Sequence, residues 1–250
     1  MKKIILIPSR LKSKRLPSKA LLEIDEMPIV MHTYQRAKLS KMADEVFICT
    51  DSMEIRKACI DFGANYIMTS KKHKNGTERI YEAAKKLKLK NNDIIIDVQG
   101  DEPLINPVAI DKTIKFYLKY NFEIVVPHID FIKRNKTNIV KLLVDDKNKI
   151  QWMTRADCPY EFIKNSKLQK HLSVIVFDFK SLQKYNKLKP SKYEKIESIE
   201  LLRAIENNMN LGSNKIKSDS FSIDVIEDLL KARRYFKDDK IKKRYLHKHK

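Results

Sequence analysis

The chain begins with MKKIILIPSRLKSKRLPSK (residues 1–19), an apolar run that ends in a cationic loop. The run Ile4–Ile7 has the length and β-branching of a buried parallel strand, and Pro8 terminates it. The loop carries five cations: Arg10, Lys12, Lys14, Arg15 and Lys19. Ligands of open α/β sheets collect outside the carboxyl ends of parallel strands, so this loop suits a triphosphate. The alternative interpretation is a solvated lysine-rich loop.

The same apolar pattern recurs along the first half of the chain and alternates with helical patterns. Strands are predicted at Ile4–Ile7, Glu45–Cys49, Tyr66–Met68, Ile94–Val98 and Glu123–Val126. Helices are predicted between them, including Ile29–Leu39, Met53–Phe62 and Thr77–Leu87. This alternation predicts βαβ units and a mostly parallel sheet.

The pattern changes after residue 127. Short apolar runs follow at Asn138–Val144, Ile150–Met153 and Leu172–Phe177, which predicts an antiparallel extension. Helices are predicted at Ser191–Asn207 and Ile223–Arg234. We therefore divide the chain into a nucleotide-binding half (about 1–127), an extension (about 128–215), a return to the core (216–236) and a basic tail (237–250) that we expect to be frayed and solvated.

The formal net charge of +20 raises the question of a nucleic-acid partner. The cations are 41 Lys and only 11 Arg, spread over all 250 residues, whereas base and phosphate recognition relies on the arginine fork. We therefore expect no nucleic-acid partner.

The cysteines and the apolar runs bear on the compartment. Cys49, Cys59 and Cys158 lack metal-ligand spacing and are typical of a reducing compartment. There is no run of about 18 apolar residues, and the amino terminus has no signal-peptide pattern. We expect a cytoplasmic protein without membrane insertion.

A second candidate site follows the strand in DIIIDVQGDEPLI (residues 93–105). Gly100 permits a turn, and Asp101 and Glu102 then emerge at the carboxyl end of the strand, next to the cationic loop. Carboxylates beside a phosphate site indicate an intervening cation, and Mg²⁺ typically joins one or two carboxylates to substrate phosphates. Asp101 is therefore a candidate metal ligand, and a polar turn that caps a helix is the alternative.

A third candidate site lies at the start of a predicted helix, in NGTER (residues 75–79). The free N–H groups of a helix start favour anions, and Thr77 and Arg79 add a hydroxyl and a guanidinium to its first turn. A plain capped helix is the alternative. The chain has four glycines, and two of them, Gly76 and Gly100, lie in these candidate loops.

Several common site patterns are absent from the sequence. G-x-G-x-x-G does not follow the first strand, and G-x-x-x-x-G-K-[ST] does not occur. Their absence disfavours a dinucleotide-dependent dehydrogenase and a P-loop NTPase. H-E-x-x-H, G-x-S-x-G and paired C-x-x-C are absent as well.

Eight ordered motifs resemble those of the cytidylyltransferases that activate 3-deoxy-manno-octulosonate (Kdo). They are IPSRLKSKRLPSK, ICTDSMEI, GTERI, VQGDEPLI, MTRADCPY, KHLSVIVF, KPSKYEKIESIELLRAIE and SIDVIEDL, and they span residues 3 to about 232. The resemblance implies a Rossmann-like, nucleotide-diphospho-sugar transferase-like α/β fold with a mixed, mostly parallel sheet and a small antiparallel extension for dimerisation and sugar binding. It also implies a homodimer, Mg²⁺, and the conversion of CTP and Kdo to CMP-Kdo and pyrophosphate for lipopolysaccharide or capsule assembly.

The resemblance also implies roles for individual residues. The triphosphate loop would contain Arg10, Arg15 and Lys19, with Pro8 and Ser9 beside the cytosine, and a second nucleotide loop would contain Gly76, Thr77 and Arg79. The two metal-binding aspartates would be Asp101 and Asp224, and catalysis would depend on them together with Arg10 and Lys19. The sugar acid would be surrounded by Gln99, Arg155, His171, Glu194 and Glu197, with Arg155 on its carboxylate. Without the resemblance, His171 is compatible with a core histidine, and Glu194 and Glu197 are compatible with an exposed helix face.

The chain departs from the family motifs around the sugar. H-L-G-I-Y-x-Y becomes His171–Phe177, L-E-Q-L-R becomes Ile199–Arg203, and G-V-D-T-P-E-D-L becomes Ser222–Leu229. Loss of pocket groups that bind hydroxyls changes selectivity, so Ile175 and Leu201 motivate a related acid, such as 8-amino-Kdo or a sialic-type acid, as an alternative substrate. A further alternative is a catalytically inert basic binding protein on the same fold.

Overall fold

The computed structural model describes residues 1–13, 15–132, 134–162, 166–217 and 220–246. Its strands are β1 (Lys3–Ser9), β2 (Glu23–Ile24), β3 (Met27–Pro28), β4 (Glu45–Thr50), β5 (Tyr66–Met68), β6 (Ile94–Val98), β7 (Ile124–Phe131), β8 (Lys141–Val144), β9 (Ile150–Thr154), β10 (Leu168–His171), β11 (Val174–Asp178) and β12 (Leu211–Lys215). Its helices are the 3₁₀ helix η1 (Lys19–Leu21) and α1 (Ile29–Ala37), α2 (Met53–Asp61), α3 (Gly76–Lys86), α4 (Pro107–Lys119), α5 (Phe179–Asn186), α6 (Lys192–Glu197), α7 (Leu202–Glu206), α8 (Ile226–Lys237) and α9 (Lys243–Leu246).

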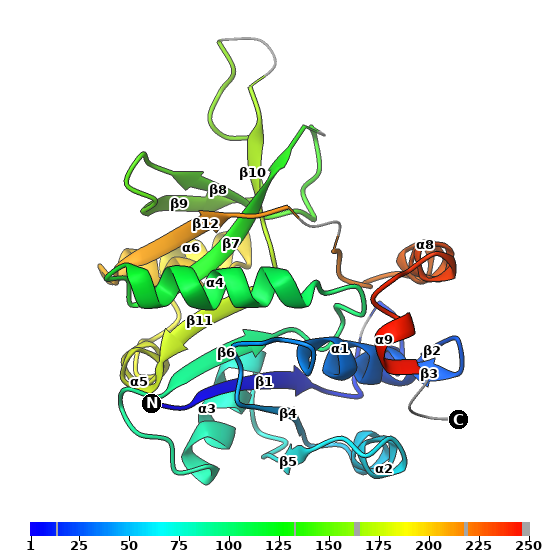
Figure 1. Cartoon of the computed structure of the whole chain (residues 1–250). Helices are drawn as coiled ribbons and strands as arrows, with labels where there is room; N and C mark the ends of the chain where they lie inside the picture. Colours follow the sequence, from blue (N-terminus) through cyan, green and yellow to red (C-terminus); the bar gives the residue numbers. More distant parts are fainter. Residues whose placement is uncertain (14, 133, 163–165, 218–219, 247–250) are drawn as a thin grey trace.

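One large mixed sheet runs through the molecule (Figure 1). Its strand order is β5-β4-β1-β6-β11-β7-β10-β8-β9, and β12 pairs with β7. Strands β5, β4, β1 and β6 are parallel neighbours, whereas β11 is antiparallel to both β6 and β7. The predicted fold class, a mostly parallel sheet with an antiparallel extension, is confirmed.

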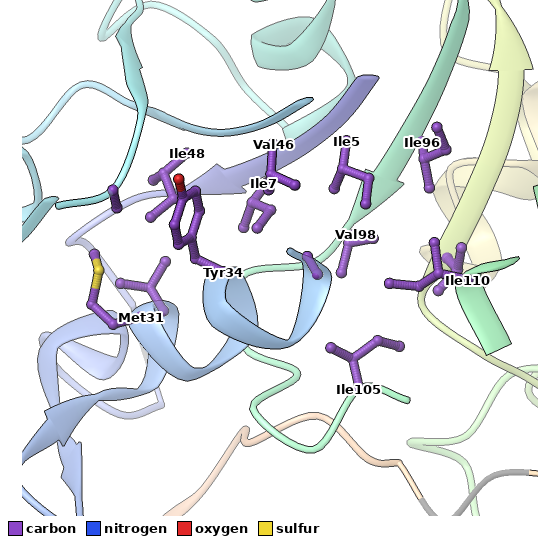
Figure 2. Packing of buried hydrophobic residues seen from close by; sticks show 14 of the residues in the cluster. Ile5, Ile7, Met31, Tyr34, Val46, Ile48, Ile96, Val98, Ile105 and Ile110 are labelled. Atoms are coloured by element: carbon purple, nitrogen blue, oxygen red, sulfur yellow. The ribbon is translucent and has the colours of Figure 1, made fainter. Parts of the chain in front are cut away.

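Helix α1 covers one face of the parallel strands (Figure 2). Ile5, Ile7 and Val98 on this face are fully buried, and Tyr34 of α1 packs against the same cluster. The opposite face of the sheet is covered by a second cluster that includes residues of α3, α5 and α7. Because both faces are covered, the strands are apolar on both sides, as the continuous run Ile4–Ile7 indicates.

The boundaries of the parallel half follow the sequence closely. Strands β5 and β6 have the predicted limits, and α1, α2 and α3 differ from their predictions by one or two residues. The predicted strand Leu172–Phe177 corresponds to β11, which begins two residues later, at Val174, and ends one residue later, at Asp178, whereas β10 (Leu168–His171) was not predicted.

The predicted helix Ser191–Asn207 is also wrong as a single element. Ser198 has a φ of 53°, in the left-handed region, and separates α6 from α7. The apolar spacing continues across this break, so periodicity alone predicted one helix.

The carboxyl-terminal segment is packed rather than frayed where the structure describes it. Tyr245 of α9 is 2% exposed, and its hydroxyl bonds Nδ1 of His32 in α1 at 2.8 Å. Arg36 of α1 forms a buried ion pair with Asp239. The predicted solvated tail is therefore wrong for this segment, and residues 247–250 lie outside the described residues. No helix in the described ranges has both the length and the apolar character needed to cross a membrane.

Candidate active site

The carboxyl ends of β1 and β6 meet the start of α3 in close backbone contact. A Cβ at Gly100 would lie 3.0 Å from the carbonyl oxygen of Pro8, and a Cβ at Gly76 would lie 3.2 Å from Pro8 Cγ. A side chain at either position would require Pro8 to shift, so close approach rather than backbone angle favours glycine at both. The contacts bring the predicted cytosine loop at Pro8 and Ser9 against both of the other candidate loops.

Lys19 joins the two predicted metal aspartates. Its Nζ lies 2.5 Å from Oδ2 of Asp101 and 3.2 Å from Oδ1 of Asp224, although 205 residues separate Lys19 from Asp224. Arg15 contacts the same Asp224 oxygen at 2.8 Å. Thus two carboxylates and two cations from distant parts of the chain form one cluster, and each side chain retains some exposure to solvent.

The two aspartates suit a divalent cation. One oxygen of each aspartate contacts the ammonium nitrogen of Lys19, so the two carboxylates are close enough to bind a single cation. Hard carboxylate oxygens, with room left for phosphate and water oxygens, are what Mg²⁺ requires. Among the described residues, no group of three or more His, Cys, Asp or Glu side chains is arranged to hold a metal ion, so a metal here would depend on ligands from a substrate as well.

The remaining cations of the nucleotide loops differ in accessibility. Arg10 is exposed just after β1, and Lys14 lies outside the described residues. Arg79 is only 4% exposed, and its guanidinium contacts Asp51 at 3.2 Å and Thr69 Oγ1 at 2.5 Å. Arg79 therefore ties α3 to the loops after β4 and β5 and does not present a free charge.

Acidic groups lie beneath the second nucleotide loop. The Thr77 hydroxyl donates to Glu200 at 3.0 Å, and the Gln99 amide donates to Asp97 at 2.8 Å. Burial raises the pKa of Asp97 well above its usual range, and the neighbouring Glu200 adds to that rise. Thr77 and Gln99 are thus held by acids that the sequence analysis did not single out.

A cleft of about 560 Å³ opens beside the aspartate cluster. Its lining includes the predicted Asp224, Arg155 and His171 together with charged residues that we had not predicted, among them Lys170, Asp228 and Lys231. Lys170 directly precedes His171 in the strand pattern, and this adjacency was the available signal for it.

Arg155 is held in the cleft without a carboxylate on its guanidinium in the described contacts. Its Nε, Nη1 and Nη2 donate to the carbonyl oxygens of Glu197, Thr137 and Ser198 at 2.7, 3.1 and 3.1 Å. Two of these carbonyls are delivered by the break between α6 and α7. The guanidinium is therefore oriented by neutral acceptors and keeps its charge available for an anion.

His171 lies on the same cleft. Burial lowers the pKa of His171 to about 4, and the nearby Lys170 contributes in the same direction, so the imidazole is neutral at pH 7. Its buried Nε2 has no hydrogen-bond partner among the described residues. A neutral imidazole with an unused ring nitrogen can bind a hydroxyl group.

Two predicted sugar residues have other partners. Both oxygens of Glu194 bond to Arg203, at 2.5 and 2.8 Å, which pins α6 to α7 away from the cleft lining. Both oxygens of Glu197 accept hydrogen bonds, from the Thr154 hydroxyl at 2.7 Å and the Arg155 amide at 2.9 Å. Glu194 is therefore engaged by Arg203 and does not line the cleft, and Glu197 acts on Arg155.

The substitutions that suggested an altered sugar pocket lie elsewhere. Ile175, Phe177 and Leu201 pack into the apolar cluster on the α3 side of the sheet and do not line the cleft. Ile175 is paired with Asp97 across β11 and β6. These three residues thus change the core beneath the site, whereas two other departures from the family motifs, Ser173 and Ser222, line the cleft.

A cleft at the carboxyl ends of the parallel strands, with a cationic loop and two neighbouring aspartates, is typical of nucleotide-binding α/β proteins. Comparison with known proteins identifies the family within this class. The family model for cytidylyltransferases matches residues 4–216, so the chain belongs to the cytidylyltransferase family. The predicted family and the predicted class of enzyme, a nucleotidyltransferase, are thereby confirmed.

Individual relatives agree with this assignment. The chain is 38% identical over 244 residues to a 3-deoxy-manno-octulosonate cytidylyltransferase of Thermodesulfovibrio yellowstonii, with 90% of this chain and 94% of the relative covered. It is 32% identical over 234 residues to an 8-amino-3,8-dideoxy-manno-octulosonate cytidylyltransferase of Shewanella baltica, covering 91% and 96%. A solved CMP:2-keto-3-deoxy-manno-octonic acid synthetase complexed with CTP superimposes with a TM-score of 0.89 at 28% identity, covering 95% of this chain and 99% of that one.

Proposed function

We propose that this enzyme couples CTP to Kdo and releases CMP-Kdo and pyrophosphate. The observation that supports it best is the aspartate cluster at Lys19, which adjoins a cleft containing an oriented arginine. The names of the relatives indicate a 3-deoxy-octulosonate as the acceptor.

In the proposed reaction the anomeric hydroxyl of the sugar attacks the α-phosphorus in line with the departing pyrophosphate. A new O–P bond forms, the bond from the α-phosphorus to the bridging oxygen of the β-phosphate breaks, and the hydroxyl proton passes to solvent water. Catalysis then consists mainly of positioning and of neutralising charge, without a covalent enzyme intermediate. Arg155 would hold the sugar carboxylate, and Arg10, Arg15 and Lys19 would neutralise the phosphates.

Asp101 and Asp224 would hold Mg²⁺. When bound there, Mg²⁺ would neutralise charge at the α-phosphate and lower the pKa of a bound hydroxyl. Lys19 contacts the same aspartate oxygens, so it would have to move from them onto the phosphates when a metal nucleotide enters.

The cleft favours Kdo over its 8-amino analogue. Within the described contacts, Asp224 pairs with Arg15 and Lys19, and Glu102 accepts from serines. Asp228 has only neutral partners, because its Oδ2 accepts two backbone N–H groups, and so it keeps its charge. An ammonium group on the sugar would meet Lys170 and Lys231, with Asp228 as the one lining acid that could offset their charge. A neutral hydroxyl carries no such cost.

Pyrophosphate release tests the proposal. The purified protein with Mg²⁺ is expected to release pyrophosphate with CTP but not with ATP, GTP or UTP, and with a higher kcat/KM for Kdo than for 8-amino-Kdo or sialic acid. Asp101→Asn is expected to abolish release, whereas Asp146→Asn, an exposed acid in the β8–β9 turn, serves as the matched control. Normal release by Asp101→Asn would refute the metal role.

Arg155→Lys tests the sugar acid separately. A lysine ammonium cannot donate to all three carbonyl oxygens and also form a bidentate pair with a carboxylate. The KM for Kdo should therefore rise about tenfold or more, while the KM for CTP is unchanged. An equal rise in both constants would contradict the assignment of Arg155 to the sugar carboxylate.

A cytoplasmic homodimer completes the proposal. The three cysteines of the chain are free thiols, which supports a reducing compartment. On the antiparallel extension Tyr160 and Phe162 are 79% and 91% exposed and pack edge to face at 5.0 Å, an apolar pair suited to a subunit contact. Sedimentation of the wild type and of Phe162→Ser would test the dimer.

A further inference from the structure

Glu102 is a buried acid that the proposed chemistry does not use. It follows Asp101 directly, is 2% exposed and borders the cleft. Burial raises the pKa of Glu102, and nearby hydroxyls oppose that rise. A buried carboxyl group is costly unless it is bonded, so its partners indicate what it does.

The Ser173 hydroxyl, between β10 and β11, is one partner, and the other two belong to the segment that leads to Asp224. The Ser220 hydroxyl donates to Oε2 of Glu102, and the Ser222 hydroxyl donates to Oε1 at 2.8 Å. Directly after Ser222, the amide of Ile223 donates to the carbonyl oxygen of Asp101 at 3.0 Å. Three hydrogen bonds thus join the two chain segments that carry the metal aspartates.

The segment is fixed on its other side as well. Asp228 of α8 accepts from the amides of Asp224 and Val225 at 3.0 and 3.2 Å, and Ile223 is fully buried. Ser222 stands where the family motif quoted above reads glycine, so in this chain one of the two hydroxyls is added to that motif.

We infer that Glu102, acting through Ser220 and Ser222, is a positioning residue that sets the separation of Asp101 and Asp224. The inference rests on the proposed function in so far as these aspartates bind the metal. Direct contact with the sugar does not explain Glu102, because both of its oxygens are already engaged and the residue is almost fully buried.

The double variant Ser220→Ala/Ser222→Ala removes both hydroxyls and little volume. Groups that orient metal ligands typically affect metal affinity by 10- to 100-fold, so the Mg²⁺ concentration for half-maximal turnover should rise about tenfold or more. At saturating Mg²⁺ the KM values for CTP and Kdo should equal those of the wild type. Glu102→Gln, which keeps one acceptor oxygen, should have a smaller effect than Glu102→Ala.

A binding measurement without turnover separates positioning from catalysis. Mn²⁺ bound by the CTP complex of the protein, without sugar, is measured by water-proton relaxation, and the double variant should bind it more weakly by the same factor. Ser40→Ala is the matched control, because Ser40 bonds Asp111 at 2.5 Å near the amino-terminal ends of the strands. It should alter the melting temperature without altering Mn²⁺ binding.

Three results would overturn the inference: wild-type metal dependence in the double variant, an equal change in Ser40→Ala, or changed substrate KM values with unchanged Mn²⁺ binding. Failure of the proposed function has a different signature. A wild type that binds Mn²⁺ with CTP but releases no pyrophosphate with Kdo would refute the sugar assignment, while the Mn²⁺ comparison would still decide the role of Glu102. A wild type that binds no Mn²⁺ with CTP would overturn the metal site and the inference together.

Discussion

Lys19 illustrates how one side chain can serve two electrostatic roles. Its ammonium bridges Asp101 and Asp224, which are the only acids we assign to the metal, and it is 16% exposed. Two adjacent carboxylates repel each other unless a cation lies between them. In the proposed reaction the same ammonium would bind the triphosphate once the carboxylates have another cation.

Lys19→Met is predicted to have opposite effects on nucleotide and metal. The KM for CTP should rise and kcat should fall by about 10²- to 10³-fold, because the variant lacks the positive charge that would stabilise the departing pyrophosphate. Mn²⁺ without nucleotide should bind more tightly, because the carboxylates lose their internal cation. Steady-state kinetics and electron paramagnetic resonance of Mn²⁺ measure the two effects.

Lys57→Met, which changes an exposed lysine of α2, is the control for Lys19→Met. Unchanged or weaker Mn²⁺ binding in Lys19→Met would show that Lys19 does not compete for the aspartates.

At the scale of elements, the site depends on how closely the ends of β1 and β6 approach. The parallel pairing of these strands places Pro8 over Gly100, and a Cβ at Gly100 would also lie 3.3 Å from Ser9 Cβ. Backbone at this contact cannot move as a side-chain tip can, so an added methyl group must displace the cytosine loop.

Gly100→Ala is predicted to lower stability by about 1–3 kcal/mol and to raise the KM for CTP. Gly212→Ala in β12 is the matched comparison, because its Cβ would overlap the Phe122 ring and should lower stability without changing that KM. Denaturant unfolding and CTP titration separate the two effects. A Gly212→Ala variant with the same rise in KM would show that the effect is not local to the cytosine loop.

The break between α6 and α7 is a second element-scale feature. A continuous helix would engage the carbonyls of Glu197 and Ser198 internally, whereas the left-handed Ser198 releases both to Arg155. The sequence pattern gives no sign of this, since the apolar residues keep helical spacing across the break.

Across the whole molecule, the carboxyl-terminal helices are joined to the first helix of the sheet by a buried polar contact. His32 Nε2 lies 2.7 Å from the carbonyl oxygen of Ile24, which can only accept, so Nδ1 must accept from the Tyr245 hydroxyl. This arrangement requires a neutral ring, and burial lowers the pKa of His32 to about 4.

Acid is therefore predicted to destabilise the protein through His32. The pKa of His32 is lower in the folded state than in the unfolded state, so between about pH 6.5 and 4 the unfolded chain binds a proton that the folded chain does not. This difference costs about 2 kcal/mol of the free energy of unfolding between pH 7 and pH 5. His32→Gln should lose less stability over that interval in denaturant titrations.

The remaining pH dependence of His32→Gln includes His171, whose pKa is lowered to about the same value, and His128, whose pKa burial also lowers. Equal pH dependence in the wild type and in His32→Gln would contradict a neutral His32.

The sequence by itself determined the parallel half of the sheet, because continuous β-branched runs such as Ile94–Val98 need burial on both faces and leave few other arrangements. It also determined the cationic loop after β1 and the carboxylate after β6, because parallel strands that pair in the same direction end at the same edge. The resemblance to the family motifs added Asp224 and Arg155 to the predicted site residues. The strands and the loops that follow them depend on local chemistry, so the amino-acid sequence predicts them.

Only the tertiary structure decided which groups remain free to act. Arg79, Glu194 and Glu197 carry charges suited to a ligand, yet each is engaged by a protein partner distant in sequence or across a turn. The break at Ser198, the packing of Tyr245 and the serine contacts of Glu102 likewise depend on distant segments. Whether a polar group binds a substrate or stabilises the fold depends on which neighbour satisfies it, and that neighbour is chosen by packing rather than by sequence spacing.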